Sequence, residues 1–435
     1  MLHRRKPGLV SARCQTNARL GVNVKSFNAK DVSMPSEQPR WLDVARLRAE
    51  TPGCQSDIIH LNNAGAALMP AAVLRALQDH LQREALFGGY EAAALAEPET
   101  EAARTEIAAL IGGSADDIAL TDSATRAWHA AVGAFDWQPG DEVLTVASEY
   151  SSHMITFRHL SRLRGIVVQM APDAADGTVD PEGLARMVGP RTRLIALTHM
   201  PTNDGLVNPA AEVGRIARAA GVPYLLDACQ SVGQCPIDVI ALGCTMLSAT
   251  GRKYLRAPRG TGFLWACRDW AETAVPPMLD LYSARWTQTE EYEIAPGARR
   301  FELWERNVAA QIGLGLACRL VRETGVEPMW ERIRGLAARL RERLHDCPGM
   351  KVHDRGTEQS GIVTFAHDCI PAERLSDLLR QRFRINTSVS AVQLTRAELL
   401  EKGVTHTVRA SPHAFTTEDE IDALIRALGR IAQDN

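Results

Sequence analysis

Lys253 stands where a lysine amine would be chemically reactive. The apolar run CTMLSA reads as a buried strand, and Lys253 follows it on a turn that contains Gly251. Burial would favour the neutral amine, and Arg252 and Arg256 would repel another positive charge, so we expect both effects to lower the pKa of Lys253. A neutral amine is a nucleophile that forms a Schiff base with a carbonyl compound. The alternative is an ordinary surface lysine in a basic loop.

Seven short apolar runs predict the sheet that positions this lysine. They are DIALT, EVLTVA, IVVQM, RLIALT, VPYLLD, CTMLSA and TGFLWAC, and most of them alternate with helical stretches. Strands buried on both faces read as continuous apolar runs, and their alternation with helices predicts a mostly parallel sheet covered on both sides. We therefore expect a large α/β domain over residues 62–280. No G-x-G-x-x-G motif follows any run, which argues against a dinucleotide site.

The rest of the chain predicts a smaller unit and its flanking segments. The runs MKVHD, GIVTFAH, RINTSVS and HTVRAS, with two helical stretches, predict an α+β domain over residues 323–435. We expect a connecting segment and linking helix over residues 281–322 and an N-terminal segment over residues 40–61. Residues 1–39 start with many basic side chains and show no sustained periodicity, so we expect a disordered extension; a transit peptide or an early start codon is the alternative.

The composition excludes several classes of protein. The 435 residues carry a formal net charge of -3, which gives no electrostatic reason to expect nucleic acid or an anionic membrane as a partner. No apolar run reaches the roughly 18 residues that a membrane helix needs. The nine cysteines form neither a CxxC pair nor a metal-ligand spacing. We therefore expect a cytoplasmic protein with free thiols and no metal site.

Polar residues follow the predicted strands at the edge where a parallel sheet binds its ligands. The tripeptide Ser-Ala-Thr at 123–125 begins a helix, whose free backbone amides suit a phosphate. Asp227 ends another strand, and Gln230 lies about one helical turn further, so both can face one planar ligand. A buried carboxylate needs a cation, which a protonated pyridine nitrogen would supply. With Lys253, these groups predict a pyridoxal phosphate (PLP) site.

Several longer motifs carry a resemblance to a known family. They are LNNAGAALMP, THMPTNDGLVNP, LLDACQSVGQCPID, LSATGRKYLRAPRGTGF, RFELWERN and VRASPHAFTTEDEID. In these motifs the sequence resembles the class V aminotransferase family of fold-type I PLP enzymes, which contains cysteine desulfurases, isopenicillin N epimerase and the carbon-sulfur lyases of ergothioneine synthesis. The resemblance runs from residue 62 to the C-terminus. It implies a fold-type I α/β enzyme and a homodimer in which Trp304, Glu305 and Arg306 reach the partner's cofactor.

The resemblance also implies roles for individual residues. Lys253 would carry the Schiff base, Asp227 would pair with the pyridine nitrogen, and Gln230 would bond the ring's phenolic oxygen. Arg409 would grip the carboxylate of an amino-acid substrate, because an arginine fork matches a carboxylate. Ser151 aligns where many relatives stack a histidine on the ring, and His153 follows it, so the stacking group stays open. The other cofactor contacts are expected from Ser123, Ala124, Thr125, Ser151, Thr202, Asn203, Thr250 and Arg252, and further substrate contacts from Asn63, Tyr150, His153 and Arg259.

One departure from the desulfurases narrows the expected reaction. Cysteine desulfurases carry a mobile cysteine shortly before the arginine strand, and the stretch SVSAVQLTRAELLEKGVTH at residues 388–406 contains none. We therefore expect a carbon-sulfur β-lyase that needs no persulfide. An aminotransferase is the first alternative and an amino-acid epimerase the second, because all three begin with removal of the Cα proton. A catalytically inactive PLP-binding regulator or scaffold is the alternative from another class.

Overall fold

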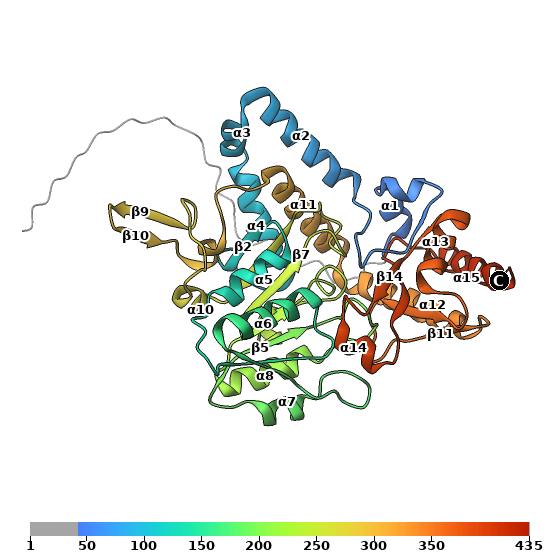
Figure 1. The fold of residues 1–435 in the computed structure, drawn as a ribbon. Coiled ribbons are helices and arrows are strands. Elements are labelled where there is room, and N and C mark those ends of the chain that lie inside the picture. Colours follow the sequence, from blue (N-terminus) through green and yellow to red (C-terminus); the bar gives the residue numbers. More distant parts are fainter. Residues whose placement is uncertain (1–41, 435) are drawn as a thin grey trace, which may run out of the picture. The chain divides into compact units, whose positions relative to one another are not determined.

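A seven-stranded sheet forms the centre of the large domain in this computed structural model, which describes residues 42–434 (Figure 1). The predicted N-terminal extension therefore lies outside the described residues. The sheet has the order β2-β8-β7-β6-β5-β3-β4, and only β8 runs antiparallel to its neighbours. This confirms the predicted α/β fold class. The strands are β2 (Ile118–Thr121), β3 (Glu142–Thr145), β4 (Val167–Met170), β5 (Thr192–Thr198), β6 (Tyr224–Asp227), β7 (Met246–Thr250) and β8 (Gly262–Ala266).

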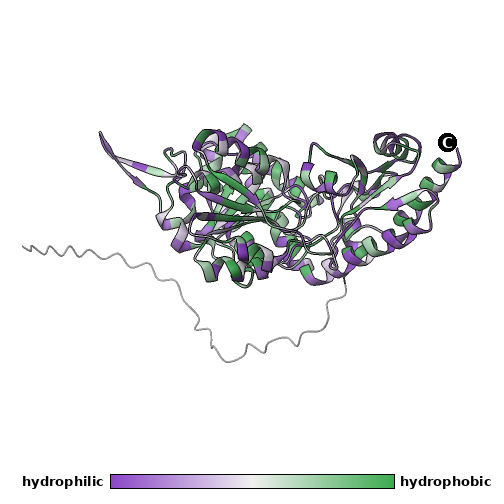
Figure 2. Ribbon diagram, turned by 60° about the horizontal axis from the view of Figure 1, so that its bottom comes forward, coloured by the Kyte–Doolittle hydropathy of each residue, from purple (hydrophilic) through white to green (hydrophobic). Residues whose placement is uncertain are grey.

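Helices cover both faces of this sheet, because successive strand residues point to opposite sides. Leu226 packs in one core with α4 (Glu97–Ile111), α8 (Ala210–Ala220) and α11 (Val308–Thr324). Its neighbour Leu225 packs in the other core with α5 (Ala124–Gly133), α6 (Ser151–Arg164) and α10 (Arg268–Thr273). Figure 2 shows the hydrophobic strands between these helices. The remaining helical segments of the large domain are α2 (Ala71–Phe87), α3 (Gly89–Leu95), α7 (Pro181–Met187), α9 (Val239–Leu242), η2 (Ala115–Asp117) and η3 (Gly297–Phe301).

The second sheet is antiparallel and has the order β11-β12-β15-β14. A parallel bridge between β1 (Ile59–His60) and β13 (Ile385–Asn386) joins the N-terminal segment to this domain, and Leu61 lies in its core. Arg48 strengthens the junction by donating to Glu420. The other elements are α1 (Val44–Ala49), η1 (Pro52–Gln55), α12 (Val326–His345), β11 (Met350–Val352), β12 (Val363–His367), α13 (Ala372–Phe383), β14 (Ser388–Ala391), β15 (His406–Ala410) and α15 (Glu418–Gln433).

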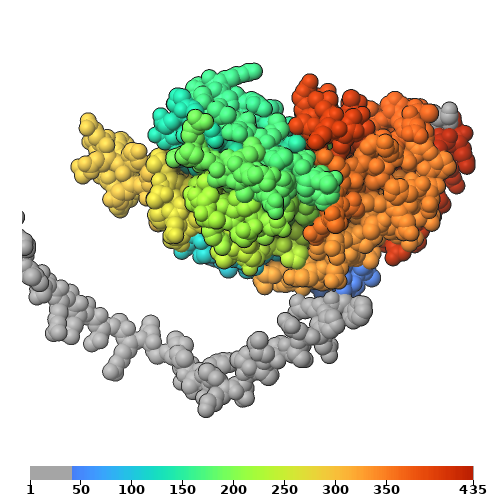
Figure 3. Space-filling model, turned by 90° about the horizontal axis from the view of Figure 1, so that it is seen from below, coloured from blue at the N-terminus to red at the C-terminus, as the bar shows by residue number. Residues whose placement is uncertain are grey.

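A hairpin and a helix were not anticipated from the sequence. Strands β9 (Ala284–Gln288) and β10 (Glu291–Ile294) pair as a hairpin that projects from the large domain (Figure 3). Helix α14 (Arg396–Glu401) occupies the stretch that lacks a cysteine. Among residues 42–434, no helix combines the length and the apolar character that crossing a membrane requires.

A buried ion cluster ties α14 to the large domain. Asp204, in the loop after β5, lies 2.5 Å from Lys402 Nζ and 3.1 Å from Arg355 Nε. Lys402 Nζ also lies 3.0 Å from Glu398 Oε1. Both carboxylates are fully buried. Burial raises the pKa of Glu398 to about 7 although Lys402 opposes the shift, and the charge of Asp204 adds to it.

This cluster predicts that stability depends on pH. The unfolded chain releases the Glu398 proton near the ordinary pKa of 4.5, whereas the folded chain keeps it up to about pH 7. The folded state binds more protons in this window, so the free energy of unfolding falls as the pH rises. Glutamine at position 398 cannot ionise. We therefore expect the free energy of unfolding of Glu398→Gln to exceed that of wild type by about 1–3 kcal/mol at pH 8. The difference should shrink toward pH 5.

Urea unfolding at the two pH values measures this difference. Glu342→Gln changes an exposed carboxylate on α12 and serves as the matched control, for which we expect the same small effect at both pH values. An equal shift of Glu398→Gln at pH 5 and pH 8 would contradict the placement of the proton on Glu398.

Candidate functional site

The first part of the site is the start of α5, which lies at the carboxyl end of the sheet. Ser123 caps the helix by accepting a hydrogen bond from the Arg126 amide at 3.2 Å. The strand β8 approaches this turn so closely that a Cβ on Gly262 would lie 2.5 Å from the Ser123 carbonyl carbon. Gly262 therefore allows the free amides of α5 to lie beside the end of β7. Such a helix start binds anions.

Lys253 lies on the turn after β7 and is buried. Its pKa is lowered to about 8, mainly by burial; Arg252 and Arg409 also lower it, and Cys229 and Asp227 oppose the shift. The sequence pointed to Arg256 as the second repelling charge. Arg256 instead donates to Leu68 and Thr51 and does not turn toward the lysine. A substantial fraction of Lys253 is thus neutral near pH 8.

Asp227 ends β6 and faces the same cavity as Lys253. Its Oδ1 accepts a hydrogen bond from the Cys229 amide at 2.8 Å. Gln230 also lines the cavity, but its Nε2 donates to Ala64 O at 3.1 Å and to Thr202 Oγ1 at 3.0 Å. Its buried Oε1 has no hydrogen-bond partner within the described residues. In this arrangement the predicted bond from Gln230 to a phenolic oxygen requires its amide to leave one of these partners.

Arg409 reaches the edge of this cavity from β15 in the small domain. Its Nη1 donates to Thr202 O at 2.9 Å and to Thr202 Oγ1 at 2.6 Å, and its Nη2 donates to Asn62 Oδ1 at 3.2 Å. Its Nε is buried and has no partner within the described residues. Because an unpartnered buried donor is costly, the guanidinium is arranged to meet an additional acceptor.

The structure brings most of the predicted residues together. One cavity is lined by Ser123, Ala124, Thr125, Tyr150, His153, Thr202, Asp227, Gln230, Thr250, Arg252 and Lys253. Ser151 lies elsewhere, in a groove between α6 and α14, and Arg259 is exposed. Asn63 is buried and donates to Ser411 O at 2.8 Å, so it ties the N-terminal segment to the end of β15. Asn203 is buried, and both polar atoms of its side chain lack a partner among the described residues.

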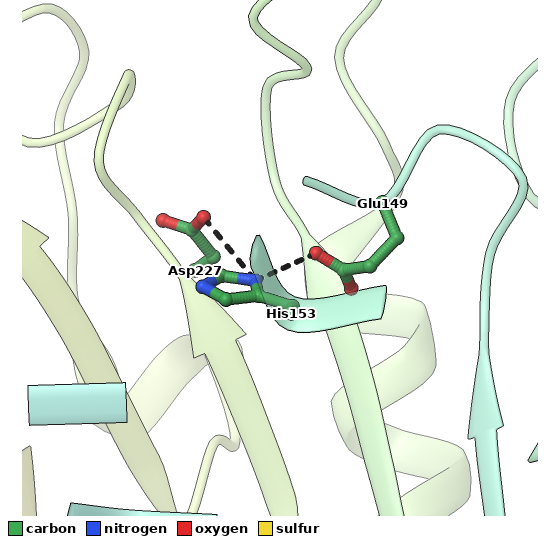
Figure 4. A group of neighbouring side chains, drawn as sticks. All are labelled: Glu149, His153 and Asp227. Atoms are coloured by element: carbon green, nitrogen blue, oxygen red, sulfur yellow. Dashed lines mark hydrogen bonds and ion pairs between the residues drawn. The ribbon is translucent and has the colours of Figure 1, made fainter. Parts of the chain in front are cut away.

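The cavity also has walls that the sequence did not single out. They are formed by Thr198, Met200 and Cys229. Beside Asp227, His153 bonds Glu149 at 2.8 Å (Figure 4). The ring of His153 also stacks on Trp128, with ring centres 4.1 Å apart. Glu149 stood next to residues that the sequence did select, but only the fold reveals that its side chain meets the ends of β3 and β5 at Thr145 and Thr198.

The sequence of this chain matches one known protein family over most of its length. The sequence profile described as aminotransferase class V matches residues 59–424. The chain belongs to the aminotransferase class V family. Pyridoxal phosphate is the cofactor of this family, so the predicted cofactor and the prediction of an enzyme are confirmed.

Individual relatives share this fold over nearly their whole length. A probable cysteine desulfurase of Xylella fastidiosa (strain 9a5c) is 29% identical over 414 residues, which cover 91% of this chain and 97% of that protein. The solved structure of the cysteine desulfurase CsdA from Escherichia coli matches with a TM-score of 0.83 and 24% identity over 90% of this chain and 98% of the other. A complex of the cystine C-S lyase C-DES with cysteine persulfide matches with a TM-score of 0.79 and 24% identity, covering 87% and 99%.

The residues of the cavity fit this cofactor. The start of α5 is an anion site that suits the phosphate, and the buried carboxylate of Asp227 suits the pyridine nitrogen. Lys253, with its lowered pKa, suits the aldehyde. Asn203, Gln230 and Arg409 each have buried polar atoms without a partner among the described residues. These atoms lie around Thr202 and can donate to or accept from a polar ligand.

Proposed function

We propose that this enzyme is a carbon-sulfur β-lyase that acts on a cysteine-derived or similar β-substituted α-amino acid. The observation that carries the proposal is the cavity in which Lys253, Asp227 and the start of α5 meet, with Arg409 at its edge and no suitably reactive thiol. Lys253 would hold the cofactor's aldehyde and Asp227 its ring nitrogen. When bound, PLP withdraws electrons from the substrate's Cα and so makes its proton acidic.

The side chains of the site divide the remaining work. The unpartnered Nε of Arg409, together with Nη2, would bind the α-carboxylate and so orient the Cα–H bond toward the lysine. Lys253, with a pKa of about 8, is neutral often enough near physiological pH to accept the Cα proton at Nζ. Tyr150 lines the cavity and would stabilise the departing group. In the elimination, the Cα–H electron pair forms the new double bond and the sulfur leaves with the Cβ–S pair.

The cysteines support a lyase that carries no persulfide on a cysteine of its own. Helix α14 and its flanking loops contain no cysteine. Cys229 is the thiol that lines the cavity, and burial together with the charge of Asp227 raises its pKa well above the ordinary value. A protonated thiol is a poor nucleophile toward sulfur. Cys369 is exposed after β12, where its amide bonds the ring of His367.

The relatives support the same class of chemistry. C-DES is described as a cystine C-S lyase, and the other two relatives as a cysteine desulfurase and a probable one. Sulfur-containing amino acids are thus the substrates named for proteins of this fold. An aminotransferase remains the rival proposal because it would use the same Lys253 and Arg409.

A substrate panel without any keto acid tests the proposal. We expect an S-substituted cysteine to give pyruvate, ammonium and a thiol in equal amounts over many turnovers, and L-cystine to give cysteine persulfide in place of the thiol. L-Alanine, which has no leaving group, should give none of these products. Keto acid that stops at one equivalent per site would show an aminotransferase, and formation of the D-isomer an epimerase. Production of L-alanine from cysteine would show a desulfurase and contradict the proposal.

We further propose that two chains assemble as a cytoplasmic homodimer through the surface around the β9–β10 hairpin. This surface exposes Met278, Leu281, Trp286, Tyr292 and Trp304, with exposed fractions between 49% and 75%. Large apolar side chains gathered in this way indicate a protein contact.

The eight cysteines of the described residues are free, which fits a reducing compartment.

Replacing Trp286 by aspartate tests this surface. A buried charge without a partner opposes association, so we expect the variant to dissociate at protein concentrations at least tenfold higher than wild type. Sedimentation velocity over a dilution series measures the change. Leu163→Asp, at a side chain on α6 that is 62% exposed, is the matched control. A wild-type protein that sediments as a monomer while fully active would contradict the proposal.

A further inference from the structure

Behind Asp227, a glutamate and a histidine are held in a fixed arrangement that the proposed chemistry has not used. Glu149, His153 and Asp227 are each at least 94% buried, and Figure 4 shows the imidazole between the two carboxylates. His153 Nδ1 lies 2.8 Å from Glu149 Oε1 and 3.8 Å from Asp227 Oδ2. One imidazole nitrogen therefore faces two buried acids.

Four donors fix the carboxylate of Glu149. Its Oε1 accepts from the Tyr150 amide at 2.8 Å, from Thr198 Oγ1 and from His153 Nδ1, and its Oε2 accepts from Thr145 Oγ1 at 3.0 Å. Burial alone would raise the pKa of Glu149, but the bonds from His153, Thr198 and Tyr150 hold it below the ordinary value. An ionised Glu149 requires the hydrogen of His153 to be on Nδ1.

The sheet explains why these groups meet. Thr145 ends β3, Thr198 ends β5 and Asp227 ends β6, and in the register of the sheet Thr198 is the neighbour of Asp227. Glu149 spans the ends of the first two strands, and His153, one helical turn later on α6, reaches the third. The two carboxylates and the imidazole could surround a cation, but three hydrogens are already directed at Glu149 Oε1, the oxygen beside His153, which leaves that oxygen no free position for a metal.

Packing fixes the plane of the imidazole as well. The ring of His153 stacks on Trp128 with an angle of 2° between the planes, and Tyr150 meets it edge-on at 5.5 Å. The nearest histidine on the packed helix, His129, bonds Thr156 Oγ1 at 2.9 Å, so it is engaged elsewhere. Turning the imidazole out of this plane would lose the stack.

We propose that Glu149 and His153 are positioning residues that keep Asp227 aimed at the cofactor's ring nitrogen. Glu149 fixes the imidazole by accepting its Nδ1–H at 2.8 Å, and the imidazole then lies 3.8 Å from Asp227 Oδ2, while Cys229 N donates to Oδ1 at 2.8 Å. Oδ2 is then the oxygen left for the protonated pyridine nitrogen. This inference rests on the proposed binding of PLP by Asp227.

Binding of two cofactors tests the inference without any turnover. PLP and its 1-deaza analogue, in which a C–H replaces the ring nitrogen, are titrated into the apoprotein of wild type, Glu149→Gln and His153→Gln, with the visible band of the lysine-bound cofactor as readout. We expect each variant to bind PLP at least tenfold more weakly and the deaza analogue within about twofold of wild type, since the analogue has no nitrogen to hold. His159→Gln, at an exposed histidine of the same helix, should bind both like wild type.

Comparison with Asp227→Asn completes the test. If Glu149 and His153 act through Asp227, the double variant Asp227→Asn/His153→Gln should bind PLP less than threefold more weakly than Asp227→Asn alone. Equal losses for PLP and the deaza analogue would overturn the inference, because they would show a merely structural role. Unchanged binding of PLP by the variants would also overturn it. A wild-type protein that binds no PLP would instead refute the proposed function itself.

Discussion

Lys253→Ala is expected to lose the covalent attachment of PLP and to turn over substrate about 10³–10⁴-fold more slowly than wild type. The variant removes both the amine that holds the cofactor and the group that accepts the Cα proton. Because the rest of the cavity stays, we expect PLP still to bind without a covalent bond through the start of α5 and Asp227. Borohydride reduction followed by mass spectrometry of the intact protein measures the covalent link.

Chemical rescue distinguishes the lost amine from a damaged site. Small primary amines such as methylamine should restore part of the turnover of Lys253→Ala, and more at higher pH, where more of the amine is neutral. Lys351→Ala, at an exposed lysine of β11, is the matched control and should behave as wild type. A reducible cofactor adduct that survives in Lys253→Ala would place the Schiff base on another residue.

The parts of the site that the sequence predicts best are those at the ends of parallel strands. Each run of apolar residues identifies a strand, and all parallel strands of one sheet present their carboxyl ends at one edge. Asp227, Thr250 and Lys253 follow this rule, as does the helix start at Ser123. For these positions, identifying a strand and its direction in the sequence is enough to place the residue at the edge that binds the ligand.

Residues on helices and long side chains were harder to place. One step along a helix turns a side chain by about 100°, so Ser151 lies in the groove beside α14 whereas His153 reaches the cavity. Arg256 is three residues from Lys253 in sequence but donates toward Thr51, while Arg409, distant in sequence, affects the lysine's pKa. Contacts of this kind depend on domain packing, which a local pattern does not contain.

The missed elements had different signals. Strands β9 and β10 carried a short signal, because apolar and polar residues alternate in ARWT at 284–287 and in EYEI at 291–294, although every side chain from Arg285 to Glu293 is exposed. Helix α14 did carry a signal, since Thr395 precedes a run of good helix formers and Gly403 follows it. The ion cluster of Asp204, Glu398 and Lys402 joins two segments about 200 residues apart and had no local signature.

The second large effect is expected at Arg409. Its guanidinium is held by Thr202 and Asn62, and its buried Nε has no partner among the described residues. A buried charged hydrogen-bonding pair that loses one member costs about 2–5 kcal/mol. We therefore expect Arg409→Ala to lower kcat/KM for the amino acid by about 10²–10³-fold, and Arg409→Lys, which keeps the charge without the fork, to lower it less.

A substrate without a carboxylate separates this role from a general effect on the site. Cysteamine has the amine and the thiol of cysteine but no α-carboxylate, so it offers the arginine nothing to bind. Its exchange with Lys253, followed through the cofactor's visible band, should proceed at similar rates in wild type and in Arg409→Ala. If the variant slowed cysteamine as much as the amino acid, Arg409 would act by supporting Thr202 and the cavity wall. If the loss is confined to the amino acid, the guanidinium contacts the carboxylate directly, and domain packing between β15 and the loop after β5 sets the substrate's orientation.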